Sequence, residues 1–148
     1  MLTSDILYLK TTNHTTIIKK SLQNEFKVDI DIYDLFDKYL LKYLTTYKGR
    51  VDATSKVYHI KKNIPVYLDY NLVFIQIFNK KQYNNIYINI CKIIDMIKDK
   101  DNTIIVFDDG SKIIIDKPYH ILKKYYNNSL KINLINFRKE IENGKEKY

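Results

Sequence analysis

The chain has 148 residues, of which 45% are apolar and 28% are charged, and its formal net charge is +8 at pH 7. This length and apolar content predict one folded domain spanning residues 1–148 and exclude a disordered tail. The longest apolar runs, such as 72–75, are far shorter than the roughly 20 residues of a membrane-spanning helix. With no signal-peptide pattern at the amino terminus and a single cysteine, the sequence predicts a cytoplasmic protein with no membrane span and no internal disulfide.

The first third of the chain predicts strands followed by a helix. Segments 5–9, 15–19 and 25–30 are rich in β-branched and aromatic residues, which favours short strands. In residues 31–46 the apolar side chains recur at helical spacing, Asp31 is a suitable N-cap, and Gly49 lies just past the expected end. We therefore expect a helix over residues 31–46.

After this helix the apolar period changes to two. Strands are predicted at 56–60, 66–69, 72–78, 85–90, 93–97, 103–107 and 112–115. Asp109 and Gly110 supply the residue types of a tight hairpin turn between the last two strands. Pro118 begins a second helix that extends to about Leu130, and a third helix is predicted at 133–142. The fold class predicted is α+β: a single domain with a mainly antiparallel sheet and two to three helices.

The sequence offers little for catalysis or for cofactors. Glycine occurs only at positions 49, 110 and 144, so neither a phosphate-binding loop nor a dinucleotide fingerprint is present. The histidines His14, His59 and His120 form no i, i+4 pair and are read as surface or half-buried side chains rather than metal ligands. Cys91 lies in an apolar run and is predicted to be a small core residue rather than a nucleophile. We expect no enzymatic activity, no cofactor and no metal.

The basic excess is concentrated in two blocks of the chain. Residues 41–66 contain six basic and one acidic side chain, and residues 111–148 contain nine and four, so that each block has a net charge of +5. Two basic blocks that meet on one face of a fold are typical of a protein that displaces counterions from DNA. The alternative interpretation is a solvated surface in a lysine-rich chain.

Two polar stretches contain the candidate contacts to DNA. The first surrounds the end of the helix predicted at 31–46, and the second is the loop 79–85, whose ammonium and amide donors suit the acceptor-lined minor groove of A·T pairs. Each stretch can also be read as an ordinary solvated connection. The candidate DNA-binding residues are Lys48, Arg50, Lys56, Lys61, Lys62, Lys80, Lys81 and Gln82.

Several of these segments resemble a known family. The pattern Tyr47-x-Gly49-Arg50, followed by Pro65 and Asp69, is similar to the ComK competence transcription factors of low-GC Gram-positive bacteria. The run 85–89, the hairpin 106–113 and the helix that follows it are also similar to ComK segments, although Asp109 replaces the family's asparagine. The resemblance covers about residues 33–132.

The resemblance implies a transcriptional activator of DNA-uptake genes. Such a protein binds A/T-rich promoter boxes in double-stranded DNA, largely through the minor groove, as a dimer or tetramer. The resemblance aligns Arg50 with the family's Gly-Arg pair and Lys81 with a loop arginine, and it places Lys48 and Lys80 beside them. Longer members carry a tail that a proteolytic adaptor recognises, and such an adaptor is a candidate partner that the resemblance raises without establishing it for this chain. The family's F-P-T stretch is replaced here by residues 74–77.

Two other functional interpretations remain open. The strand at 87–89 and the sheet-rich second half are also consistent with a LytTR-like DNA-binding regulator. A ComK-derived partner protein would instead regulate by mixed oligomerisation or by adaptor binding, without DNA contact. Salt-dependent retention on an A/T-rich duplex distinguishes the DNA-binding interpretations from the last one.

Overall fold

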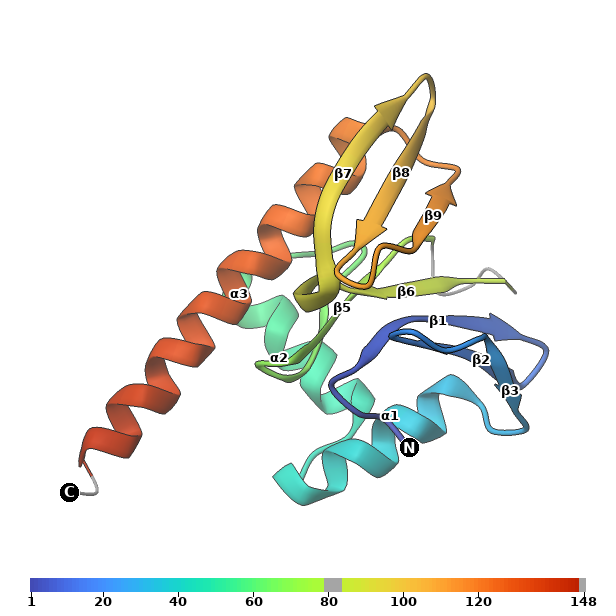
Figure 1. Cartoon of the computed structure of the whole chain (residues 1–148). Coiled ribbons are helices and arrows are strands. Elements are labelled where there is room, and N and C mark those ends of the chain that lie inside the picture. Colours follow the sequence, from blue (N-terminus) through green and yellow to red (C-terminus); the bar gives the residue numbers. More distant parts are fainter. Residues whose placement is uncertain (79–83, 147–148) are drawn as a thin grey trace.

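The computed structural model describes residues 1–78 and 84–146, and its first layer is a six-stranded antiparallel sheet (Figure 1). The strand order is β3-β2-β1-β6-β5-β4. The strands are β1 (Ile6–Thr12), β2 (Thr15–Lys20), β3 (Phe26–Val28), β4 (Val66–Asp69), β5 (Leu72–Gln76) and β6 (Ile86–Asn89). The α+β class with a mainly antiparallel sheet is thereby confirmed.

Both faces of the six-stranded sheet are covered. On one face, α1 (Ile32–Leu40) and α2 (Tyr47–Tyr58) pack against the sheet around Phe36, Phe74 and Tyr87, all completely buried. On the other face, alternate residues such as Val73 and Ile75 join a second core cluster. Because β5 is buried on both sides, its sequence is a continuous apolar run rather than an alternating one.

The second core cluster lies under a three-stranded sheet and a long helix. The antiparallel strands β7 (Ile93–Asp99), β8 (Asn102–Phe107) and β9 (Lys112–Ile115) follow the short 3₁₀ turn η2 (Ile90–Lys92). Their inner residues Ile105, Phe107 and Ile115 pack with Leu122 of α3 (Tyr119–Glu146). The turn predicted between β8 and β9 is confirmed, and Gly110 adopts a φ of +87° there.

The prediction for residues 31–60 is partly wrong. Asp31 is the N-cap of α1, as expected, but α1 ends at Leu40, the 3₁₀ turn η1 (Leu41–Tyr43) follows, and Leu44 is left-handed at a φ of 60°. A new helix, α2, then begins at the cap Thr46, whose side chain accepts a hydrogen bond from the N–H of Gly49. Gly49 therefore lies inside α2, and the region predicted as a strand at 56–60 is the end of that helix and the residues just past it.

Two further predictions are corrected in the carboxyl-terminal half. The helices predicted at about 118–130 and 133–142 are one continuous helix of 28 residues, since Ile132 is buried in the core and keeps α3 against the sheet. Cys91, predicted to be a core residue, is exposed. The reason is that η2 turns Ile90 inward, to 4% exposure, and the next side chain outward.

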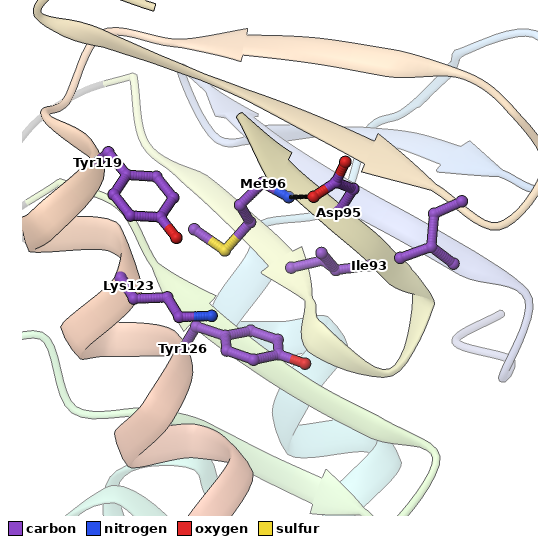
Figure 2. A pocket seen from close by; sticks show the side chains of 7 residues that line it. Ile93, Asp95, Met96, Tyr119, Lys123 and Tyr126 are labelled. Atoms are coloured by element: carbon purple, nitrogen blue, oxygen red, sulfur yellow. Dashed lines mark hydrogen bonds between the residues drawn. The ribbon is translucent and has the colours of Figure 1, made fainter. Parts of the chain in front are cut away.

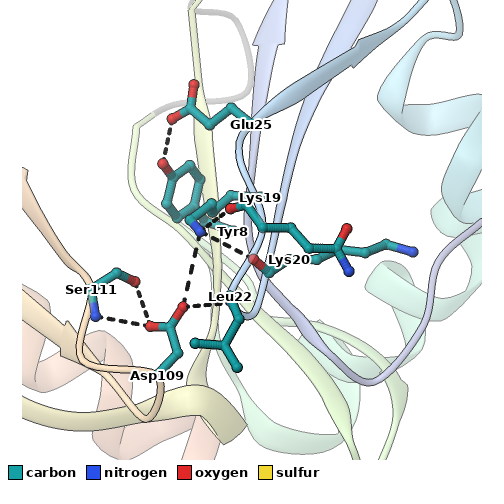
Figure 3. A network of polar contacts seen from close by, with 8 residues as sticks. Tyr8, Lys19, Lys20, Leu22, Glu25, Asp109 and Ser111 are labelled. Carbon is teal, nitrogen blue, oxygen red and sulfur yellow. Dashed lines mark hydrogen bonds and ion pairs between the residues drawn. The ribbon is translucent and has the colours of Figure 1, made fainter.

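A polar network fastens the two sheets together (Figure 3). The carboxylate of Asp109, in the β8–β9 turn, accepts hydrogen bonds from the N–H of Leu22 at 3.0 Å and from the N–H and hydroxyl of Ser111 at 2.9 and 2.6 Å. It also lies 3.9 Å from the ammonium of Lys19 on β2. Burial alone would raise the pKa of Asp109, but these donors and the Lys19 charge together lower it to about 2.

Candidate nucleic-acid interface

A basic groove runs between the end of α2 and the exposed side of α3. It consists of two adjoining hollows, of about 590 and 410 Å³, which share Tyr58, His59, Ile60 and Asn128. One wall is the α2–β4 connection and the other is α3. We call this feature the lysine groove, after the five lysines that line it: Lys61, Lys62, Lys124, Lys131 and Lys139.

The charge of the lysine groove is uncompensated. Its described lining residues include neither aspartate nor glutamate. Within the part of the chain that the structure describes, the ion pairs involve other cations, and none joins a groove lysine to a carboxylate. The five lysine side chains are exposed, and they come from both basic blocks of the sequence. The fold therefore brings the two basic blocks together on one surface.

Hydrogen bonds hold the walls of the groove in place. The side-chain amide of Asn136 on α3 donates to the hydroxyl of Tyr58, the last residue of α2, at 3.0 Å. On the other side, the amide of Asn63 donates to the carbonyl of Gln76 at 2.9 Å, which ties the α2–β4 connection to the end of β5. Burial raises the pKa of Tyr125, so this tyrosine of the groove remains a neutral phenol at physiological pH.

The eight residues predicted from the sequence do not all lie together. Lys61 and Lys62 line the lysine groove. Lys48 lies about 180° around α2 from the groove residue Val57, and its ammonium is 3.2 Å from the carboxylate of Asp52. Lys56, about two helical turns beyond Lys48, is exposed on α2. Lys80, Lys81 and Gln82 lie outside the described residues.

Arg50 occupies an intermediate position. It precedes Val57 by seven residues, which places it on the groove side of α2, two turns toward the amino end. Its guanidinium carbon lies 5.4 Å from the ring centre of Tyr43 and 5.8 Å from that of Tyr67, so cation–π contacts hold the side chain. Arg50 is thus positioned at the end of the groove with its charge free of a carboxylate partner among the described residues.

Sequence reasoning identified the second basic block but not its contacts. The residues Lys124, Lys131 and Lys139 are spaced by seven and eight, which puts them on one side of a continuous helix. Because the sequence prediction divided this region into two helices near residue 131, the spacing that puts the three lysines on one side of a single helix was not recognised. The missing step was therefore the continuity of α3.

A second hollow lies on the other side of α3. A small cleft of about 130 Å³ between β7 and α3 is lined by Met96 of β7 and by Tyr119, Lys123 and Tyr126 of α3 (Figure 2). Among the described residues, no three His, Cys, Asp or Glu side chains are grouped as a metal site would require. No helix in the described ranges is long and apolar enough to cross a membrane. The lysine groove is the larger and more strongly charged feature.

Comparison with known proteins identifies the family. The model of the ComK protein family matches residues 2–141, which is almost the whole chain and extends the segment 33–132 over which the sequence resemblance was noted. No curated protein and no solved structure matches the chain significantly. The chain therefore belongs to the ComK family of competence transcription factors.

Proposed function

We propose that the chain binds double-stranded DNA through the lysine groove and activates transcription of DNA-uptake genes. The observation that supports this is the convergence of five lysines from two distant blocks on a groove whose described lining has no carboxylate. Lysine ammonium groups bind phosphates as point charges and release condensed counterions from the duplex, which supplies affinity without reading sequence.

The dimensions of the groove suit a phosphate backbone. Along α3, Lys124 to Lys139 spans 15 residues, which corresponds to about 22 Å. Over that length B-DNA rises about six base pairs, at 3.4 Å each. Lys61 and Lys62 face Lys124 across the groove at one end, and Arg50 extends the cationic track at the other. In this proposal the groove positions the duplex.

In this proposal, hydrogen-bond donors outside the lysine groove read the base sequence of the DNA. The family resemblance implies that an oligomer reads A/T-rich boxes through the minor groove. In the sequence, segment 79–83 follows directly after Phe78, two residues beyond the end of β5. The side chain of Asn63 donates to the carbonyl of Gln76 and so ties the groove wall to that end of β5. We propose that the donors of this segment, Lys80, Lys81 and Gln82, read the A·T acceptors. Inosine·cytosine pairs test the groove that is used, because they present the minor-groove pattern of A·T and the major-groove pattern of G·C.

Fluorescence anisotropy with an A/T-rich duplex over a range of salt concentrations tests the groove. With five phosphates neutralised, the log–log slope of affinity against salt should be about −4.5. Changing Lys124→Gln and Lys131→Gln together should reduce the steepness of that slope by about 1.8. A matched control is Lys98→Gln with Lys100→Gln, which removes the same charge at the far end of the three-stranded sheet.

The outcomes separate the alternatives. A flat salt response of the unmodified protein would contradict DNA binding and would favour the partner-protein interpretation. Equal effects of the groove pair and the control pair would show that net charge, rather than the lysine groove, governs affinity.

A further inference from the structure

The solvent-facing side of the three-stranded sheet has an apolar row. Ile97 of β7 pairs with Ile104 of β8, and Ile104 pairs with Ile114 of β9, so these three side chains stand in register across the sheet. Their neighbours in sequence, such as Ile105 and Ile115, are buried on the opposite side. Ile114 is 64% exposed and Ile97 is 41% exposed, although isoleucine is usually among the most buried residues.

The next row on the same face carries opposite charges at its two ends. Asp95 of β7 pairs with Val106, which pairs with Lys112 of β9, and both charged side chains are exposed. Asp95 accepts a hydrogen bond from the N–H of Met96 through one oxygen, and its other oxygen has no recorded partner among the described residues. The face is therefore apolar in the middle, acidic at the β7 edge and basic at the β9 edge.

We infer that this face is the contact between two copies of the chain. Two sheets that pack face to face lie about 10 Å apart with their strands nearly aligned. A two-fold axis parallel to the strands sets β7 of one copy over β9 of the other. Ile97 then faces Ile114 of the second copy, Ile104 faces its own equivalent, and Asp95 faces Lys112, each contact occurring twice.

Charge selects this arrangement over the other two-fold packing. An axis across the strands would set β7 over β7 and bring the acidic edges together. The other end of the sheet is balanced, with Lys98, Lys100 and Lys117 beside Asp99, Asp101 and Asp116. A second copy of a chain with a net charge of +8 can therefore approach here without the repulsion that it would meet at the lysine groove.

The area of the face sets the strength of the contact. Three strands at a spacing of about 4.8 Å, each with about six residues at 3.4 Å, present about 300 Å² of sheet. This is less than the roughly 800 Å² per partner of a stable interface, so we expect weak, reversible self-association rather than a permanent dimer. Two copies on one duplex would be held close together, which strengthens a contact of this size.

Sedimentation equilibrium of the full chain without DNA tests the inference. The unmodified protein should pass reversibly from monomer to dimer as its concentration is raised, and Ile114→Lys should abolish the dimer. The matched control is Ile94→Lys, because Ile94 is 65% exposed but is the extra residue of the irregularity between Ile93 and Asp95, where it pairs with no residue of β8 and lies outside the isoleucine row. Circular dichroism and thermal melting establish that both variants are folded.

A charge exchange tests the predicted geometry. Asp95→Lys and Lys112→Asp should each weaken the dimer, and the two changes combined should restore it, because the pair is re-formed with reversed sign. A protein that remains monomeric at all concentrations, or a dimer that is unaffected by Ile114→Lys, would overturn the inference. Since no DNA is present, these outcomes are independent of the salt experiment on the lysine groove.

Discussion

The hydrogen bond from the amide of Asn136 to the hydroxyl of Tyr58, at 3.0 Å, joins α3 to the last residue of α2. Residues 78 positions apart in the sequence are thereby held side by side, and the two basic blocks that flank them face the same groove. The same amide also donates to the carbonyl of Ile132 at 2.8 Å, within α3. This second bond orients the side chain of Asn136 within α3, so that its amide is already directed toward Tyr58 on α2.

Tyr58→Phe should lower the free energy of unfolding by about 0.5–1.5 kcal/mol, the usual net value of one hydrogen bond. The lower end applies because Asn136 keeps its bond to Ile132 and is not left unsatisfied. Urea denaturation measures the change. Tyr119→Phe is the control, since no hydrogen bond of its hydroxyl is recorded among the described residues; an equal loss in both variants would contradict a specific role for the Tyr58 bond.

Lys48 and Lys131 distinguish the DNA contacts predicted from the sequence from those proposed at the lysine groove. Lys131→Gln should reduce the steepness of the salt dependence of DNA affinity by about 1, as expected for one lost phosphate contact. Lys48→Gln should leave it nearly unchanged, because Lys48 faces away from the groove and Asp52 already offsets its charge. Anisotropy titrations at several salt concentrations measure both. The reverse order of effects would place the duplex along the exposed face of α2 instead.

Asp109 makes stability depend on acid pH. Its folded pKa of about 2 is below the unfolded value of about 3.9, so its contribution is fully present above pH 4 and is lost as the pH falls toward 2. Asp109→Asn should cost about 1–3 kcal/mol at neutral pH, because bonds to a charged acceptor become bonds to a neutral one. It should also remove part of the loss of stability between pH 4 and pH 2.

Thermal melting at a series of pH values provides this measurement. The control is Asp108→Asn, whose carboxylate is more exposed and is 3.4 Å from Lys92. Exposed ion pairs contribute little, so this variant should keep the acid dependence of the unmodified protein. If the two variants titrate alike, the buried network of Asp109 is not the source of the effect.

The strands were predicted better than the helices, and the reason is physical. Period-two patterns and the Asp-Gly turn are local, and the bounds of β9 agree with the prediction to the residue. The helix α2 was missed because Gly49 was read as a terminator, whereas the cap at Thr46 and the spacing of Tyr47, Val51, Thr54 and Tyr58 continue the helix.

The candidate site was predicted only as charge. The two blocks were identified from the sequence, their meeting on one face was a hypothesis beside that of a solvated surface, and Lys61 and Lys62 were among the predicted residues. The lysines of α3 and the pairing of Lys48 with Asp52 depend on how helices pack, which periodicity does not specify. Lys80, Lys81 and Gln82 remain predictions, as do the A/T boxes and the adaptor.

Two glycines should respond oppositely to alanine. Gly110 has a φ of +87°, and a Cβ there would meet no atom within 4 Å, so Gly110→Ala costs about 1–2 kcal/mol through backbone strain alone. Gly49 lies in the first turn of α2, and a Cβ there would meet the hydroxyl of Thr45 at 2.9 Å and that of the cap Thr46 at 3.3 Å, so Thr45 must rotate away and Thr46 must give slightly. Gly49→Ala should therefore be neutral or stabilise the protein by up to about 1 kcal/mol, through helix propensity. Urea denaturation of the two variants compares them directly. Destabilisation by Gly49→Ala as large as that by Gly110→Ala would mean that Thr45 is fixed in place and that the start of α2 requires glycine for space.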